Sequence, residues 1–200
     1  MKQLIHKLAL KVGIKLAPET DWLTGLKLIL KVVKLRMPSL IPKFKIARRE
    51  KVGLRGEFLI RQIRDGEVIA QRRFANLIVN AGKAEVAALL GAVTGGVAFG
   101  YLAVGTGTVA PAATDTALGA EITTGGLARA ASANTQVTTT VTNDTLQMVK
   151  EWTASASHAV TEAGAFNDAS AGDMLCRQTF AAVNLVSADK LEVTYKVQAS

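Results

Sequence analysis

The sequence has little of several residue types on which enzyme sites and small extracellular domains depend. Of its 200 residues, one is Cys, two are His and only 5% are aromatic. A single cysteine excludes a disulfide within the chain and a Cys-rich metal site. We predict that Cys176 is a small buried hydrophobe in a strand. Because 49% of the residues are hydrophobic and few are aromatic, the core must rely on aliphatic side chains.

Long uncharged hydrophobic runs are also missing from the N-terminal region. Lys7, Lys11 and Lys15 interrupt the first sixteen residues, and no small-residue cleavage pattern follows, so we expect no signal peptide. Lys27 and Lys31, with two further basic residues, interrupt the segment 22–37. We therefore expect no transmembrane helix in that segment.

Charge is distributed unevenly along the chain. Residues 1–52 hold 13 Lys and Arg against three acidic residues, a net charge of +10. Residues 53–200 hold 11 Lys and Arg against 13 acidic residues, a net charge of −2. We interpret residues 1–52 as a basic arm that meets an acidic surface, and residues 53–200 as a separate domain.

Helical periodicity in the arm predicts two amphipathic helices. One covers residues 2–16, and the second follows Pro18, with Thr20 or Asp21 as its N-cap, over residues 22–37. In each helix, lysines spaced three or four residues apart form a stripe opposite an apolar stripe. Residues 39–50, which follow Pro38, are expected to form an extended basic linker.

Beyond residue 52 the pattern becomes that of short strands. Asp65-Gly66 lies between two β-rich runs and predicts a type I′ hairpin. Residues 82–91 predict one short helix, and residues 105–119 a long loop. Seven or eight strands separated by turns favour an antiparallel β-sandwich or jelly roll, so the fold class is mainly β.

Several sequence blocks occur in an order that resembles a group of tailed-phage virion proteins. The blocks are NLIVNAG at 76–82, YLAVGTG at 101–107, AP at 110–111, DTALGAE at 115–121, RA at 129–130, TEAGAFN at 161–167 and MLCR at 174–177. The resemblance covers about residues 56–198 and leaves out the arm. It implies a β-sandwich that assembles with copies of itself or with other virion proteins of the tail-fibre, baseplate or accessory type. It implies no catalytic residue and no cofactor.

The blocks also have a physical interpretation of their own. Gly105 and Gly107 relieve steric limits where a strand runs into a tight loop, and Thr106 lies between them. Asp115 can hydrogen-bond nearby backbone and so shape a long loop without a core. Glu162-Ala163-Gly164 places small residues where another backbone can approach closely. We predict that the long loop over residues 105–119 makes assembly contacts through Gly105, Thr106, Gly107 and Asp115.

Patterns that would indicate catalysis are weak. Gly105-Thr106-Gly107 has neither the Gly-Lys-Ser/Thr ending of a phosphate loop nor the following helix of a dinucleotide site. His158 near serine residues shows no third orienting group. Asp168 and Asp173 could hold Ca²⁺ weakly, but a turn capped by Asx side chains is favoured. We therefore expect a protein that is not an enzyme, with no metal and no cofactor.

The arm is where the sequence predicts contact with a partner. Its apolar stripe would enter a groove on another virion protein and its lysines would meet an acidic rim. The residues assigned to this docking are Lys7, Lys11, Lys15, Trp22, Leu26, Lys27, Ile29, Lys31 and Lys34. Contact of the arm with nucleic acid or a membrane surface stays an alternative. So do two roles for the domain, binding a host receptor or glycan and decorating the capsid.

Overall fold

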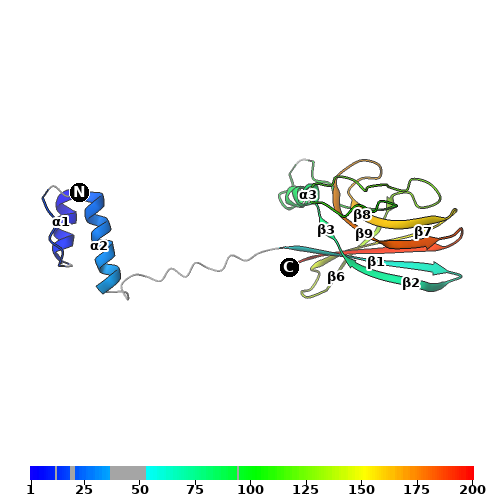
Figure 1. Ribbon diagram of the computed structural model, residues 1–200, viewed down its shortest axis with the longest axis horizontal. Helices are drawn as coiled ribbons and strands as arrows, with labels where there is room; N and C mark the ends of the chain where they lie inside the picture. Colours follow the sequence, from blue (N-terminus) through cyan, green and yellow to red (C-terminus); the bar gives the residue numbers. More distant parts are fainter. Residues whose placement is uncertain (12, 19–20, 37–52, 94) are drawn as a thin grey trace. The chain divides into compact units, whose positions relative to one another are not determined.

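The computed structural model describes residues 1–11, 13–18, 21–36, 53–93 and 95–200 (Figure 1). The chain divides into two compact units, Met1–Glu50 and Lys51–Ser200, close to the boundary expected after residue 52. The side chains of Trp22, Leu30 and residues 32–36 lie outside the described part of the chain, as does the predicted linker over residues 39–50.

The N-terminal unit contains two α-helices that pack against each other. They are α1 (Lys2–Lys11) and α2 (Trp22–Arg36). Their contact is a small apolar core in which Ile5, Ala9 and Ile29 are buried. Ala9 is fully buried, and its small side chain lets the helices approach closely. Part of each predicted apolar stripe is therefore covered within the arm itself.

The predicted ends of the first helix are partly wrong. The helix stops at Lys11 rather than at residue 16, because Gly13 adopts a left-handed conformation with φ of 74°. The N–H of Ile14 then bonds back to the carbonyl of Ala9, which closes the helix end. The predicted cap of the second helix is confirmed for Asp21, whose Oδ1 accepts the N–H groups of Leu23 and Thr24 at 2.9 and 3.0 Å.

The second unit is a sandwich of two five-stranded antiparallel sheets, which confirms the predicted mainly-β class (Figure 1). Sheet A has the order β2-β1-β10-β7-β6, with bounds Glu67–Ala75, Leu54–Arg64, Lys190–Ala199, Thr145–Thr153 and Ala133–Val137. Sheet B has the order β3-β9-β8-β4-β5, with bounds Leu77–Ile78, Met174–Leu185, His158–Phe166, Tyr101–Gly105 and Ala130–Ala131. Helix α3 (Asn80–Leu90) follows β3.

The main core lies between the two sheets. Side chains that alternate along β10, at Leu191, Val193 and Tyr195, are all fully buried, as the period-two pattern predicts. Cys176 of β9 is buried in the same core, where burial raises the pKa of its thiol to about 12. The prediction of a small buried cysteine is confirmed.

The hairpin predicted at Asp65-Gly66 is confirmed. The two residues have φ of 51° and 85°, as a type I′ turn requires, and they join β1 to β2. The Thr-rich sequence around residues 136–141 predicts a strand over that range, but β6 runs over Ala133–Val137, so the prediction is wrong in its position. The carboxylate of Asp144 accepts the N–H groups of residues 139–141, and this holds them in a turn instead.

A second, smaller core covers the outer face of sheet B. Leu118, from the predicted long loop, packs with Ala103, Phe166 and Met174 of three strands and with Val79. The expectation of a loop without a core is therefore wrong. The segment between β4 and β5 lies over sheet B, and this placement positions the site described next.

Candidate functional site: a buried loop network and a basic helical surface

A carboxylate buried beneath the long loop is the centre of the first candidate site. The Glu162 side chain, on β8, is fully buried. Its Oε1 accepts the N–H of Gly107 at 2.9 Å and that of Ala120 at 2.7 Å. Its Oε2 accepts the N–H of Gly119 at 3.0 Å and Nε of Arg177 at 2.8 Å. One side chain therefore ties both ends of the loop to sheet B.

Arg177, on the neighbouring strand β9, extends this arrangement into the middle of the loop. Its Nη1 lies 2.6 Å from Oδ2 of Asp115, and its Nη2 donates to the carbonyl of Val109 at 3.0 Å. Asp115 also accepts the N–H of Ala112 at 2.9 Å. We call Glu162, Arg177 and Asp115 the loop network. It joins two strands to the start, the middle and the end of the loop.

The glycines at the start of the loop are needed because Glu162 lies so close. A Cβ on Gly105 would lie 2.5 Å from the carbonyl oxygen of Ala120 and from Oε1 of Glu162. A Cβ on Gly107 would lie 2.4 Å from the same carboxylate oxygen. Real side chains do not approach so closely, so only glycine allows the backbone N–H of residue 107 to reach the carboxylate.

The electrostatics of the loop network suit structure rather than proton transfer. Burial alone would raise the pKa of Glu162, but the hydrogen bonds from Ala120, Gly119, Arg177 and Gly107 outweigh it, so the pKa lies below its ordinary value. The Asp115 pKa is also lowered, first by the N–H of Ala112 and then by Arg177. Both carboxylates are ionised at neutral pH, and each oxygen of Glu162 already accepts two hydrogen bonds.

The predicted loop residues converge on this network, although the sequence did not show why. Gly105, Gly107 and Asp115 contact it directly, and the N–H of Thr106 bonds to the carbonyl of Ala120 at 2.8 Å. Sequence reasoning missed Glu162 and Arg177 as the ion pair beneath the loop. The only available signal was a charged residue in a strand otherwise rich in Ala and Gly.

The lysines assigned to docking lie on the surface of the N-terminal unit. Lys7, Lys11, Lys15, Lys27 and Lys31 are all exposed. Lys15 follows the end of α1 and so is not on the helical stripe that the sequence predicted. The side chains of Trp22 and Lys34 lie outside the described part of the chain.

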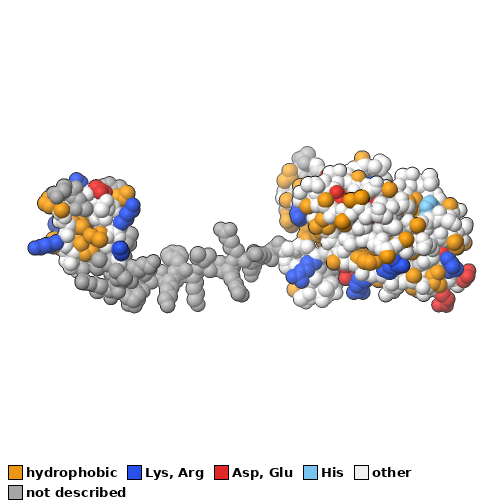
Figure 2. All heavy atoms as spheres, in the orientation of Figure 1, with side chains coloured by type: hydrophobic (Ala, Val, Ile, Leu, Met, Phe, Trp, Pro, Cys, Tyr) orange, Lys and Arg blue, Asp and Glu red, His pale blue; other side chains and the backbone are white. Residues whose placement is uncertain are grey.

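Unlike the lysines, the apolar residues assigned to docking whose side chains the structure describes lie in the contact between the two helices. Ile29 is 3% exposed in the contact between α1 and α2, and Leu26 packs beside it. Other leucines remain open to solvent instead: Leu4, Leu8, Leu10, Leu23 and Leu28 are between 42% and 68% exposed. Figure 2 shows hydrophobic and basic side chains interleaved on this unit. Surface leucines, rather than Ile29, are therefore available to a partner.

Other residues considered for chemistry have structural contacts. Asp168 Oδ1 accepts the N–H groups of Ser170 and Ala171 at 3.1 and 3.4 Å, and Asn167 Oδ1 accepts that of Asp173 at 2.7 Å, which is the favoured Asx-type turn. His158 packs against Gly125. In the part of the chain that the structure describes, no three metal-ligating side chains gather at one point.

Comparisons with protein-family models, curated proteins and solved structures find no match to this chain. Among the described residues, no helix is both long enough and apolar enough to cross a membrane.

Proposed function

We propose that this chain is a non-enzymatic structural protein of a bacteriophage particle. Its N-terminal unit docks on other virion proteins, and its β-sandwich packs in, or projects from, the tail, tail fibre, baseplate, neck or capsid surface. The sequence blocks that resemble tailed-phage virion proteins support the assignment of this chain to a phage particle. The surface of the N-terminal unit supports the docking role, and it is the observation that carries the proposal.

That surface combines apolar and positive groups on one short helix. Leu4 is 68% exposed and Leu8 is 45% exposed, one helical turn apart on α1. Lys7 and Lys11 have the same spacing and are also exposed. Exposed leucines next to lysines are typical of a helix whose surface is covered by a partner with an apolar groove and an acidic rim.

The net positive charge of the arm favours an acidic partner, which can be another copy of this chain. The arm, residues 1–52, carries +10 and the remaining 148 residues carry −2. Opposite net charges on the two parts draw the arm of one copy toward the sandwich of another as well as toward other acidic virion proteins. Homo-oligomers are therefore part of the proposal.

The loop network supports a role without catalysis. Its carboxylates and guanidinium are used to hold the loop, as described above, and an ionised, fully bonded carboxylate cannot serve as a general acid. The thiol of Cys176 is buried with a pKa of about 12, which does not suit a nucleophile. The outer part of the loop, where Val109 is 75% exposed, stays available for packing against other subunits.

Incorporation into particles tests the proposal. We expect the full chain to be found in purified phage particles, and a chain lacking residues 1–50 to be absent from them. A far-UV circular dichroism spectrum and unfolding curve of the truncated chain show whether the sandwich still folds. A folded truncated chain that still enters particles would contradict the docking role.

Point variants separate the surface of the arm from its fold. Replacing Leu4 and Leu8 together by Ser should lower incorporation severalfold, because both side chains are exposed and their loss leaves the α1–α2 core intact. Leu90→Ser is the matched control, since Leu90 is 85% exposed on α3. Equal incorporation of both variants would contradict docking through α1.

A further inference from the structure

An open groove on the outer face of sheet A is the feature that the proposed function leaves unused. Its volume is about 580 Å³, and it lies among strands β1, β2, β10 and β7 and the turn before β7. The residues that line it are Arg55, Gly56, Glu57, Arg73, Ala75, Thr139, Thr145, Lys196 and Gln198. We call it the sheet A groove. Its volume is in the range of cavities that hold small ligands.

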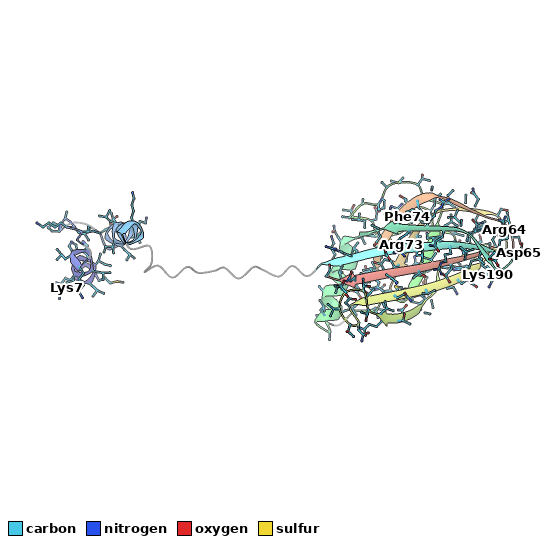
Figure 3. The ribbon with its side chains drawn as sticks, turned by 90° about the horizontal axis from the view of Figure 1, so that it is seen from below. Lys7, Arg64, Asp65, Arg73, Phe74 and Lys190 are labelled. Atoms are coloured by element: carbon cyan, nitrogen blue, oxygen red, sulfur yellow. The ribbon has the colours of Figure 1, made fainter. Side chains whose placement is uncertain are left out.

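Strand register explains why these side chains meet. Arg55 of β1 pairs with Gln198 of β10, and Glu57 pairs with Lys196 on one side and with Ala75 on the other. Residues two apart on a strand share a face, and directly paired residues have Cβ atoms about 5 Å apart. Figure 3 views the sandwich from the side of sheet A, with Arg73 labelled.

Positive charge exceeds negative charge in the groove. Three cationic side chains, Arg55, Arg73 and Lys196, face one carboxylate, that of Glu57. Arg73 lies 3.5 Å from Glu57. Of the ion pairs formed between described residues, none includes Arg55 or Lys196. The groove is therefore locally positive in a domain whose net charge is −2.

A nearby carboxylate reduces this positive excess without removing it, because three cationic side chains then stand against two carboxylates. Asp144 lies beside the groove, and its two oxygens accept the N–H groups of residues 139–141 and bonds from Thr145 and Gln198. These donors hold the Asp144 pKa well below its ordinary value, so the group is ionised but already surrounded by donors. Its contacts also fix Gln198 and Thr145 at the groove wall.

We propose that the sheet A groove binds an acidic saccharide, a sugar that carries a carboxylate or a phosphate. Arginine and lysine side chains bind such anions through charge-assisted hydrogen bonds. Thr139, Gln198 and Glu57 provide a hydroxyl group, an amide oxygen and a carboxylate to which sugar hydroxyls can bond. Among the described residues that line the groove none is aromatic, so the base stacking that holds single-stranded nucleic acid has no platform there.

This inference does not depend on the proposed role of the arm, and its test keeps the two apart. The full chain is titrated by isothermal calorimetry, in low salt, with a glucuronate-containing disaccharide, with glucose 6-phosphate and with neutral maltose. We expect one or both acidic sugars to bind with a stoichiometry of one and maltose to bind far more weakly. Comparing the two acidic sugars shows whether carboxylate or phosphate is preferred. Equal binding of maltose, or no binding of any probe, would overturn the proposal.

The +10 arm could also attract anions, so matched variants locate the site. Replacing Arg55 and Lys196 together by Gln should raise the dissociation constant at least about tenfold, since one charge-assisted contact is worth roughly that much. The control replaces Lys83, on α3, and Lys190, at the other end of sheet A, by Gln and removes the same charge. Equal loss in both variants would show binding by net charge alone and would refute the site. Unfolding curves show that each variant is folded.

A DNA oligonucleotide completes the comparison. If the acidic saccharide occupies the groove, single-stranded DNA should bind the wild type and the Arg55/Lys196 variant equally, through the arm, with strong salt dependence. A saccharide that binds the two proteins equally, while DNA binding falls in the variant, would mean that the groove recognises nucleic acid and would overturn the proposal.

Discussion

Nε of Arg177 lies 2.8 Å from Oε2 of Glu162, and the two side chains are 3% and 0% exposed. They come from adjacent strands, β9 and β8, and face the loop that covers sheet B. Charges at such depth need partners, and each has several: three backbone N–H groups for the carboxylate, and Asp115 and a carbonyl for the guanidinium. The fold of a long surface loop therefore depends on one buried ion pair.

Removing the charge of Glu162 should destabilise the sandwich strongly. Glu162→Gln keeps the shape of the side chain but leaves the buried Arg177 with Asp115 as its one remaining carboxylate partner among the described residues, and it places an amide N–H₂ against backbone donors. We expect the free energy of unfolding to fall by about 3 kcal/mol or more. Urea denaturation measures it. Glu192→Gln is the control, because its ion pair with Arg61 is partly exposed and should contribute at most about 1 kcal/mol.

Substitution of Gly107 tests whether steric room for the carboxylate is required. Gly107→Ala places a methyl group against Oε1 of Glu162, so we expect a loss of about 1–3 kcal/mol in the free energy of unfolding and faster amide exchange in the loop. A Cβ on Gly100 would meet nothing within 4 Å, so Gly100→Ala is a matched control. Equal effects of the two substitutions would argue against the close approach.

Stability should fall in acid in a defined window. Asp189, bonded to Arg64 at 2.6 Å, has a pKa held below its ordinary value of 3.8, first by Arg64 and then by Val186 and Gln62. A carboxyl group whose pKa is lower in the folded state stabilises the fold above its unfolded pKa and loses that effect as pH falls toward the folded value. We expect little change in melting temperature between about pH 7 and 5 and a steady fall below about pH 4.

Asp189→Asn checks the origin of that fall. The variant should be less stable than the wild type at pH 7, because Arg64 loses its partner. The difference between the two proteins should shrink as the pH approaches 2, where the wild-type carboxyl group is increasingly protonated. Urea denaturation at several pH values gives the comparison. A difference in the free energy of unfolding that stays constant across this range would contradict the assigned role.

Cys176 should be unreactive until the protein unfolds. It is fully buried, and its thiol has a pKa of about 12, so thiolate is scarce at neutral pH. With a chromogenic disulfide reagent at pH 8, we expect almost no reaction in buffer and one thiol per chain in concentrated urea. Because the sequence contains one cysteine, the signal needs no further assignment. Rapid labelling of the native protein would contradict the burial.

Patterns within about ten residues of the sequence determined much of the local structure. Hydrophobic residues at every second position along residues 191–197 indicate the side chains of a strand that face the protein core. Asp65-Gly66 indicates a turn conformation that few residues adopt. The helices of the arm follow from a period of 3.6 residues. Each of these features is set by neighbouring residues, so the sequence alone predicts its existence and type. Exact ends, such as that of α1 at Lys11, depend on single backbone angles.

The tertiary structure alone decided how distant segments meet. Glu162 contacts backbone more than forty residues away, at Gly107, Gly119 and Ala120, and no local pattern encodes such a meeting. Pairing of β1 with β10 likewise joins the two ends of the domain and creates the sheet A groove. In the arm, the contact between α1 and α2 removed Ile29 from the surface and left Leu4 and Leu8 exposed. Amphipathic periodicity shows that a helix has an apolar face, but only packing determines which part of that face is already covered.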